Sequence, residues 1–367
     1  MHPSPESSPE QSSKPTNQAQ QDIGNNQGQT FGQMSGGNAN NISGSNVYFV
    51  DSNGIALDQK GLSAKPVIPS LLPYLPDRTD QEYTLSLAIQ KWQSRSKRQP
   101  LICLIHGDEL QSHDKFLERL RKVSLPRLLN IDLKQTAIKE HHLQWPASLK
   151  NLDRLSARLS KNLADTVENN SYAPVEQINK TFGKHPGPVI VHLHLLTDDW
   201  RRLGPDLIHK ILEFWQRWPE LGVNQTLVVC VFVKYQLKRS RIERKRRWLI
   251  NPFAWLRRFR RFIKCRRCQK MNHEIIEQLE NLNASEFRDF NHLTGVVLPK
   301  LDNVNRTHVE DWVRCPETSQ FTGEAVLEQL LSAVGQLFEQ EETMPMDNVA
   351  THLTKLLKEA VISGRQL

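Results

Sequence analysis

The residues whose types most clearly suggest a binding or catalytic site follow the apolar run Leu101–Ile105. Gly107 opens a polar loop, and a helical pattern of apolar residues follows that loop. A strand, a loop that begins with glycine and a helix are the layout of a P-loop, which binds nucleotide phosphates through backbone amides, a lysine and a Mg²⁺-binding hydroxyl. In the motif G-x-x-x-x-G-K-[ST], however, the last three positions of this chain hold Ser112, His113 and Asp114.

Each of these three residues removes a contribution to phosphate binding. Ser112 has a Cβ where a glycine would let the backbone approach phosphate closely. His113 is mostly neutral near pH 7 and is shorter than the lysine it replaces. Asp114 puts a carboxylate in place of the hydroxyl, and Asp108 and Glu109 add two more acids, each of which costs about 1–4 kcal/mol beside a triphosphate. The sequence therefore predicts a degenerate nucleotide site with no catalytic residue and no cofactor.

A second acidic pair, Asp198 and Asp199, follows the apolar run Pro188–Leu196. This is the pattern of a Walker B strand, whose terminal acids hold Mg²⁺ or orient water. The alternative is that the aspartates cap the next helix, and the missing lysine and hydroxyl in the loop favour this structural role. An atypical NTPase that uses Lys115 with both aspartates is the competing interpretation. Lys115 lies two positions beyond the P-loop lysine, so we expect it to face away from the phosphates.

Two groups of residues have the chemical types of metal ligands. His192 and His194 share one face of a predicted strand, because side chains alternate along a strand. Cys265 and Cys268 form a C-x-x-C pair, with His273 as a third candidate zinc ligand. Neither group has enough ligands in the sequence to favour a metal site, so we predict core or edge histidines and no bound metal.

Apolar runs alternate with helical patterns along the chain, which favours an α/β fold with a P-loop NTPase-like parallel sheet flanked by helices. The five predicted strands are Leu101–Gly107, Arg127–Leu133, Pro188–Leu196, Thr226–Tyr235 and Gly295–Leu301. Amphipathic patterns predict C-terminal helices, one over Glu324–Phe338 and one that begins at Asp347. A capping box at Thr79–Glu82 predicts the start of a helix before the first strand.

The segments Leu72–Trp92 and Leu101–Lys122 resemble the inactive STAND domain of bacterial conflict and signalling systems. Proteins of this family are relatives of STAND NTPases in which the nucleotide site has decayed, and the resemblance extends over residues 70–362. It implies a sheet of strand order 5-1-4-3-2 and a non-catalytic scaffold or adaptor in signalling, immunity or programmed cell death. Active STAND proteins have an Arg-Glu signature at this entry, which Arg78, Asp80 and Glu82 partly match, although capping accounts for these residues as well.

The positive charge of the chain is concentrated in residues 237–273, called here the basic insert. Between Lys238 and Lys270 there are 15 basic residues and one acidic residue, a net charge of +14, whereas the rest of the chain carries −6. Three interpretations remain open: a helical hairpin packed on its own domain, an interfacial helix on anionic lipid, and a site for an acidic partner or, least favoured, nucleic acid. The candidate interaction residues are Arg246, Arg247, Trp248, Trp255, Arg257, Arg258, Arg260 and Arg261.

Residues 1–50 form an N-terminal tail of low complexity, which a proline-containing linker over residues 51–76 joins to the domain over residues 77–362. Between Asn17 and Val50 the only charged residue is Asp22. This composition predicts either a disordered tail or a short cross-β signalling motif that pairs with a similar segment of a partner. We expect the tail to recruit protein partners, an effector or a sensor, with homotypic pairing through residues 17–50 as one form of this recruitment.

The composition also predicts a cytoplasmic protein. No apolar run approaches the ~18 residues of a membrane span, and residues 1–30 lack the apolar core of a signal peptide. The five cysteines are scattered, which is typical of reduced cysteines in the cytosol. If the basic insert binds lipid, we expect the protein to lie at the inner face of the membrane.

Overall fold

The computed structural model describes residues 68–236, 252–290, 292–322 and 326–363, and the side chains of residues 252–265, 320 and 361–363 fall outside this description. The chain divides into two units, and all described residues belong to the second, Val47–Leu367. The predicted N-terminal tail, most of the linker and the first part of the basic insert, with Arg246, Arg247 and Trp248, lie outside the described residues.

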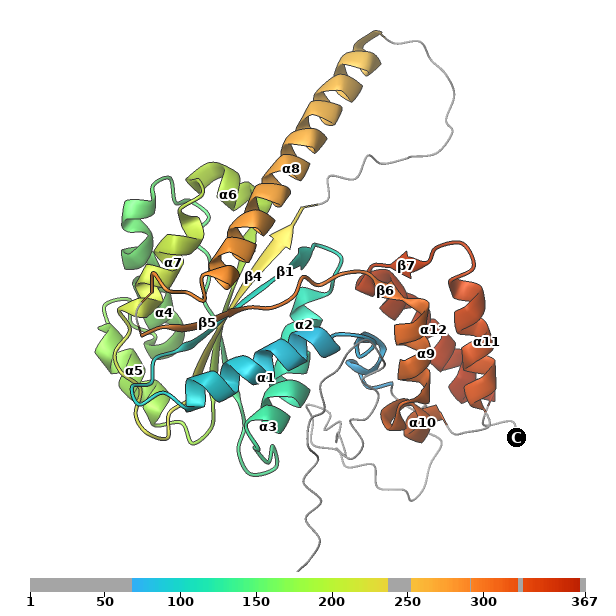
Figure 1. Ribbon diagram of the computed structural model, residues 1–367, viewed down its shortest axis with the longest axis horizontal. Helices are drawn as coiled ribbons and strands as arrows, with labels where there is room; N and C mark the ends of the chain where they lie inside the picture. The colour runs from blue at the N-terminus through green and yellow to red at the C-terminus, as the bar shows by residue number, and fades with distance from the viewer. Residues whose placement is uncertain (1–67, 237–251, 291, 323–325, 364–367) are drawn as a thin grey trace, which may run out of the picture. The chain divides into compact units, whose positions relative to one another are not determined.

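Five parallel strands form the central sheet, in the order β2-β3-β4-β1-β5 (Figure 1). The strands are β1 (Leu101–Asp108), β2 (Lys139–His142), β3 (Val189–Leu196), β4 (Leu227–Tyr235) and β5 (Thr294–Val297). The three central strands are buried along nearly their whole length, as is typical of apolar parallel strands covered on both faces. The predicted strand order and the parallel α/β fold are confirmed.

Helices cover both faces of the sheet, because right-handed crossovers that run in opposite directions along a sheet lie on opposite faces. The first connection leads from β1 to the edge strand β2, and the later connections return across the sheet. Accordingly α1, α2 and α3 lie on one side and α4 to α8 on the other (Figure 1). The first side holds α1 (Thr79–Gln93), α2 (His113–Arg119), the π-helical turn η2 (Leu120–Ser124) and α3 (Leu125–Leu128). The second holds η3 (Leu152–Arg154), α4 (Leu155–Glu168), α5 (Val175–Gly183), α6 (Thr197–Leu203), α7 (Leu207–Gln216) and α8 (Pro252–Ala284).

The second strand is not where the sequence predicted it. Arg127–Leu133 was the predicted strand, but these residues form the end of α3 and the turn after it, and β2 is Lys139–His142. Leu129 and Leu133 pack against the core from this helix and turn, which produces an apolar run without a strand. β2 lies at the edge of the sheet and buries only His141, so its sequence has no apolar pattern.

A second hydrophobic core holds the C-terminal helices together. Its elements are η1 (Leu72–Tyr74), β6 (Val304–Asn305), α9 (Arg306–Arg314), α10 (Pro316–Thr322), α11 (Leu327–Leu337), β7 (Thr343–Met344) and α12 (Met346–Ser363). Val309, Val334 and Leu357 are fully buried in this core. The Trp312 indole donates a hydrogen bond to the Leu72 carbonyl at 2.9 Å, which joins α9 to the segment before α1. The two predicted C-terminal helices are confirmed as α11 and α12.

The capping box predicted at the start of α1 is not formed. The N-cap position is Arg78, one residue earlier than the sequence pattern indicated, and no side chain caps the helix there. The Glu82 carboxylate is instead buried in an ion pair with Arg119. The Thr79–Glu82 pattern therefore fits a capping box in the sequence, but the fold uses Glu82 for a different contact.

Gly107 is required by close packing against the segment that follows β5. The two backbones form a bridge between Gly107 and Leu301. A Cβ at position 107 would lie 2.7 Å from the Leu301 Cβ and 2.9 Å from its carbonyl oxygen, closer than a side chain can come. The glycine that matches the first P-loop position is thus explained by sheet packing, without a phosphate.

Candidate functional site

The loop between β1 and α2 and the start of α2 contain three of the predicted site residues, Ser112, His113 and Asp114. Ser112 adopts a left-handed backbone conformation, with φ at 53°, and α2 begins at the next residue, His113. The His113 imidazole is buried, and its Nε2 lies 3.1 Å from the Asp108 carbonyl oxygen. Burial, reinforced by the charge of Lys234, lowers the pKa of His113 to about 4. The residue at the position of the P-loop lysine is therefore neutral at pH 7.

Three lysines near this loop are paired with acids of the chain itself. The Lys234 ammonium lies 3.1 Å from Asp114 Oδ1. Lys115 lies 2.8 Å from a glutamate of its own helix, and Lys300 lies 2.8 Å from Asp302. A phosphate at the loop would have to compete with these carboxylates for each of the three cations.

The backbone and side chains of the loop are bonded to distant parts of the chain. The Glu109 amide donates to the Tyr235 carbonyl at the end of β4, at 3.0 Å, and the Leu110 carbonyl accepts from the Asp347 amide at the start of α12, also at 3.0 Å. The Ser112 hydroxyl donates to the Asp347 carboxylate. In a working P-loop the amides point at phosphate, whereas here the loop is held by the neighbouring strand and by the C-terminal helices.

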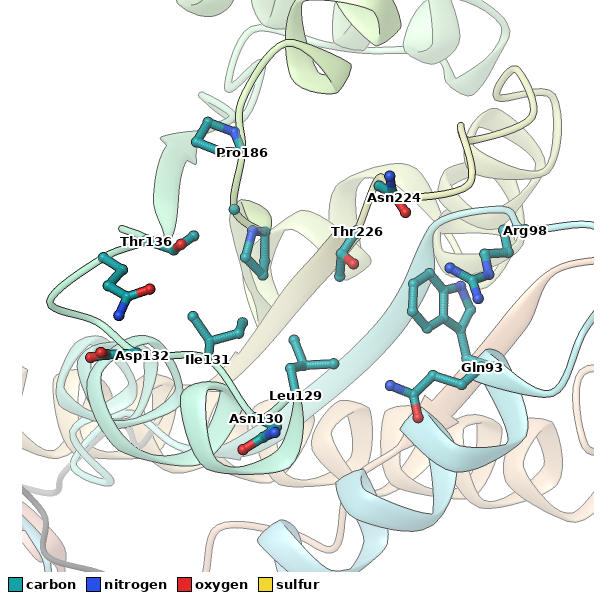
Figure 2. A pocket seen from close by; sticks show the side chains of 14 residues that line it. Gln93, Arg98, Leu129, Asn130, Ile131, Asp132, Thr136, Pro186, Asn224 and Thr226 are labelled. Carbon is teal, nitrogen blue, oxygen red and sulfur yellow. The ribbon is translucent and has the colours of Figure 1, made fainter.

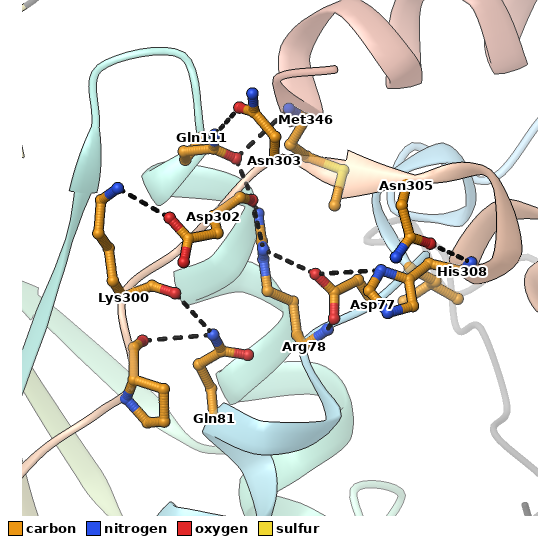
Figure 3. A network of polar contacts seen from close by, with 12 residues as sticks. Asp77, Arg78, Gln81, Gln111, Lys300, Asp302, Asn303, Asn305, His308 and Met346 are labelled. Atoms are coloured by element: carbon orange, nitrogen blue, oxygen red, sulfur yellow. Dashed lines mark hydrogen bonds and ion pairs between the residues drawn. The ribbon is translucent and has the colours of Figure 1, made fainter. Parts of the chain in front are cut away.

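A buried arginine connects this loop to two further segments (Figure 3). The Arg78 guanidinium donates to the Gln111 side-chain oxygen and to the Asp302 carbonyl, both at 3.1 Å, and pairs with Asp77 at 3.2 Å. Gln111 in turn donates to the Asn303 side chain at 2.8 Å. Burial lowers the pKa of Arg78 to about 10, so the group stays charged at pH 7. These contacts join the loop, the entry to α1 and the β5–β6 connection.

A second buried ion-pair cluster lies one turn further along α1. The Glu82 carboxylate accepts from Arg119 and from the Ser124 hydroxyl, each at 2.8 Å, and also pairs with Arg127. Burial alone would raise the pKa of Glu82, but the charges of Arg119 and Arg127 outweigh this effect, and the pKa lies below its ordinary value. Arg78 and Glu82, which partly matched the Arg-Glu signature, are thus both partnered inside the chain.

Asp198 and Asp199 lie in the first turn of α6. Asp199 Oδ2 accepts a hydrogen bond from the Leu196 amide at 3.0 Å, and Oδ1 pairs with Arg202 at 2.6 Å. Asp198 lies 3.3 Å from Arg201. Asp199 therefore caps the helix from its third residue, which is the structural role that the sequence favoured over a Walker B role.

Two residues of this site, Gln111 and Asp347, were not singled out for the loop by sequence analysis. Asp347 was predicted only as the start of the last helix. Its contact with Ser112 joins residues 235 positions apart, and such a contact leaves no local pattern in the sequence. For Gln111, the only available signal was that it is a polar residue in the loop with the P-loop-like pattern.

A depression of about 520 Å³ lies at the opposite end of the sheet (Figure 2). Arg98, Pro188 and Thr226, which precede β1, β3 and β4, contribute to its wall. Arg98 also donates to the Val223 carbonyl at 2.7 Å. Open α/β sheets bind ligands at the carboxyl ends of their strands, whereas this depression lies at the amino ends. It is therefore separate from the β1–α2 loop.

The second part of the basic insert lies in α8. Five predicted interaction residues belong to this helix, with side chains outside the described part: Trp255, Arg257, Arg258, Arg260 and Arg261. Further along α8, Ile275 and Leu279 are buried in the main core, so this end of the helix packs on its own domain. No helix in the described part of the chain has the length and apolar character needed to cross a membrane.

Comparison with known proteins shows one family whose model matches part of this chain. Residues 73–233 match the model of a family described as inactive STAND. This part of the chain is thus similar to the inactive STAND family. The match covers the sheet from β1 to β4 and the α1 entry, and therefore contains both the Arg78 contacts to Gln111 and the Glu82 cluster. No curated protein matches the chain.

Several solved structures resemble this chain at low identity. The Aeropyrum pernix ORC2 protein in ADPNP–ADP complexes is 9% identical, with a TM-score of 0.33 over 77% of this chain and 69% of that chain. The Aeropyrum pernix ORC1 protein in complex with DNA is 13% identical, with a TM-score of 0.28 over 78% and 69%. Cdc6p from Pyrobaculum aerophilum is 12% identical, with a TM-score of 0.24 over 82% and 97%. Similarity at this level supports no inference about function.

The Glu82 cluster predicts a specific dependence of stability on pH. Because the folded-state pKa of Glu82 lies below the ordinary value of 4.5, its contribution is present in full above pH ~4.5 and is lost as the pH falls toward the folded-state pKa. We expect Glu82→Gln to lower the free energy of unfolding by ~3–5 kcal/mol at pH 7, since it leaves Arg119 buried with one charge partner fewer. Urea unfolding between pH 3 and pH 7 measures both effects.

The matched control is Glu286→Gln, which removes an exposed ion pair with Lys91 and should leave the free energy of unfolding nearly unchanged, because exposed ion pairs contribute little to stability. The difference between Glu82→Gln and the wild type should shrink below pH ~4.5. A difference that stays constant over the whole pH range would contradict the role of this carboxylate.

Proposed function

We propose that this protein is a non-catalytic scaffold or adaptor that acts in the bacterial cytoplasm, in signalling, immunity or programmed cell death. The observation that carries the proposal is the bonding of the β1–α2 loop. The Arg78 guanidinium donates to the Gln111 side chain, and the Asp347 amide donates to the Leu110 carbonyl of the loop. A neutral His113 lies at the position of the P-loop lysine. A phosphate group would have to displace these contacts without gaining a new cation. The sheet would then serve as a rigid base for the regions that contact partners.

An atypical NTPase is the alternative, with Lys115, Asp198 and Asp199 as its working groups. Lys115 pairs with Glu118 at 2.8 Å and lies 5.5 Å from the centre of the Tyr74 ring. Both aspartates pair with arginines of their own helix. Nucleotide or Mg²⁺ binding by these groups would require several ion pairs to break, so the contacts favour the scaffold over the enzyme.

Calorimetric titration of the full chain tests the non-catalytic part of the proposal. Mg·ATP and Mg·GTP should show no binding up to about 1 mM, a limit that corresponds to ~4 kcal/mol of binding free energy. The physical reason is that three acids surround the loop and its nearby lysines are paired. Micromolar binding by the wild-type chain would contradict the proposal, and its loss in Lys115→Ala would assign the binding to the NTPase alternative.

The N-terminal tail and the basic insert are the regions proposed to contact partners. The low charge and the Asn/Gln content of residues 17–50 suit a cross-β pairing with a similar segment of an effector, a sensor or a second copy of the chain. The net charge of +14 between Lys238 and Lys270 suits an anionic surface, either the inner face of the membrane or, less favoured, nucleic acid. The domain over residues 77–362 would carry both regions.

Affinity capture tests the role of the tail. The full chain should retain a specific protein partner from a lysate of its own organism, and a chain without residues 1–65 should lose that partner, because the tail supplies the pairing segment. The matched control neutralises the insert by changing Arg257, Arg258, Arg260 and Arg261 to Gln, and it should retain the partner. Capture of the same protein by the shortened chain would contradict recruitment through the tail.

A further inference from the structure

Three histidines from two neighbouring strands lie side by side at the edge of the sheet. His192 and His194 are two residues apart in β3 and share one face, and His142 is the last residue of β2 and the register partner of His192. The metal-ligating atoms that the three residues offer all lie within 4.8 Å of one another. The third ligand that the sequence lacked for His192 and His194 is therefore His142, which was hidden because β2 was predicted at other residues.

The separation of two of these imidazoles matches a metal site. His192 Nδ1 lies 3.3 Å from His194 Nε2. Two nitrogens bound to one tetrahedral Zn²⁺ at 2.0–2.1 Å are about 3.3–3.4 Å apart. The His142 ring is stacked on the His192 ring at 4.8 Å between centroids, and its side chain is exposed. A rotation of this exposed side chain would bring the third nitrogen to the same ion.

The Glu140 carboxylate lies where it could accept a hydrogen bond from His192 if that histidine bound a metal. With His192 Nδ1 facing the ion, the other ring nitrogen, Nε2, lies 3.2 Å from Glu140 Oε1. Within the described part of the chain, this buried Nε2 has no hydrogen bond with good geometry. Histidines that bind metals commonly donate their second N–H to a carboxylate, which fixes the tautomer and the ring orientation. Glu140 is positioned to do this for His192.

The charged groups around the three histidines balance one another. Four charged groups face the cluster, and their charges cancel: Lys234 and Arg121 are cations, while Asp114, 3.6 Å from His194 Nε2, and Glu140 are anions.

We propose that His142, His192 and His194 bind one divalent transition-metal ion, with Zn²⁺ as the ion of matching ligand chemistry. Neutral imidazoles suit zinc and its neighbours in the first transition series. The ion would join the short edge strand β2 to β3 and would lie at the carboxyl ends of the strands, beside Asp114 of the degenerate loop. The proposal is independent of the scaffold role, since it rests on the geometry of this cluster alone.

Titration of the full chain with Zn²⁺, and with Co²⁺ as a spectroscopic probe, tests the site. The wild-type chain should bind one Zn²⁺ with micromolar or tighter affinity and give the visible absorption bands of tetrahedral Co²⁺. His142→Asn should weaken Zn²⁺ binding at least tenfold and remove these bands, since it deletes one of three ligands. Because His142 is exposed, this variant should keep the circular dichroism of the wild type.

Two controls separate this site from other ligands in the chain. His352→Asn changes an exposed histidine of α12, and a variant with both Cys265 and Cys268 changed to Ser removes the C-x-x-C pair. Both should bind Zn²⁺ as the wild type does. The proposal is overturned if the wild type binds no Zn²⁺, if His142→Asn binds it unchanged, or if the cysteine variant alone loses it.

Discussion

The structure depends on the burial of one guanidinium, that of Arg78. A charge with 2% of its side chain exposed is stable only when its donors are satisfied, because an unpaired buried charge costs several kcal/mol. Its partners come from three segments: Asp77 before α1, Gln111 in the β1–α2 loop and the Asp302 carbonyl after β5. The β1–α2 loop, which has the P-loop-like pattern, is therefore a structural partner of a buried arginine.

The residues of the P-loop-like pattern also have contacts inside the chain that account for their types. Gly107 is needed for its close approach to Leu301, and Ser112 is needed for its bond to Asp347. His113 is a buried, neutral side chain that stacks edge-on against Phe232 of β4. Three positions of the P-loop-like pattern, Gly107, Ser112 and His113, therefore have structural roles inside the chain.

The sequence predicted the sheet well wherever strands were central. The runs that became β1, β3 and β4 are apolar because both of their faces are covered, and their order followed from the family resemblance. The edge strand β2 was missed, because a strand that buries only His141 has no apolar run. Residues whose roles depend on distant contacts, such as Gln111 and His142, were also missed, since no local pattern marks the partner.

The capping box predicted at the start of α1 was wrong for a related reason. Thr79–Glu82 fits a capping box, but Glu82 forms ion pairs with Arg119, the last residue of α2, and with Arg127 of α3. Leaving the buried Arg119 without this carboxylate would cost about 3–5 kcal/mol, more than the loss of a helix cap of about 1 kcal/mol. Tertiary contacts thus overrode the pattern at the positions that matter most for the site.

Hydrogen exchange in an Arg78→Met variant tests most directly whether this arginine holds the loop and the C-terminal helices together. The amides of Gln111 and Asp347 should exchange faster than in the wild type, while those of α4 stay unchanged, and Lys91→Met, which alters an exposed ion pair, should change neither. Unchanged exchange at Gln111 and Asp347, or an equal increase over the whole sheet, would contradict this account.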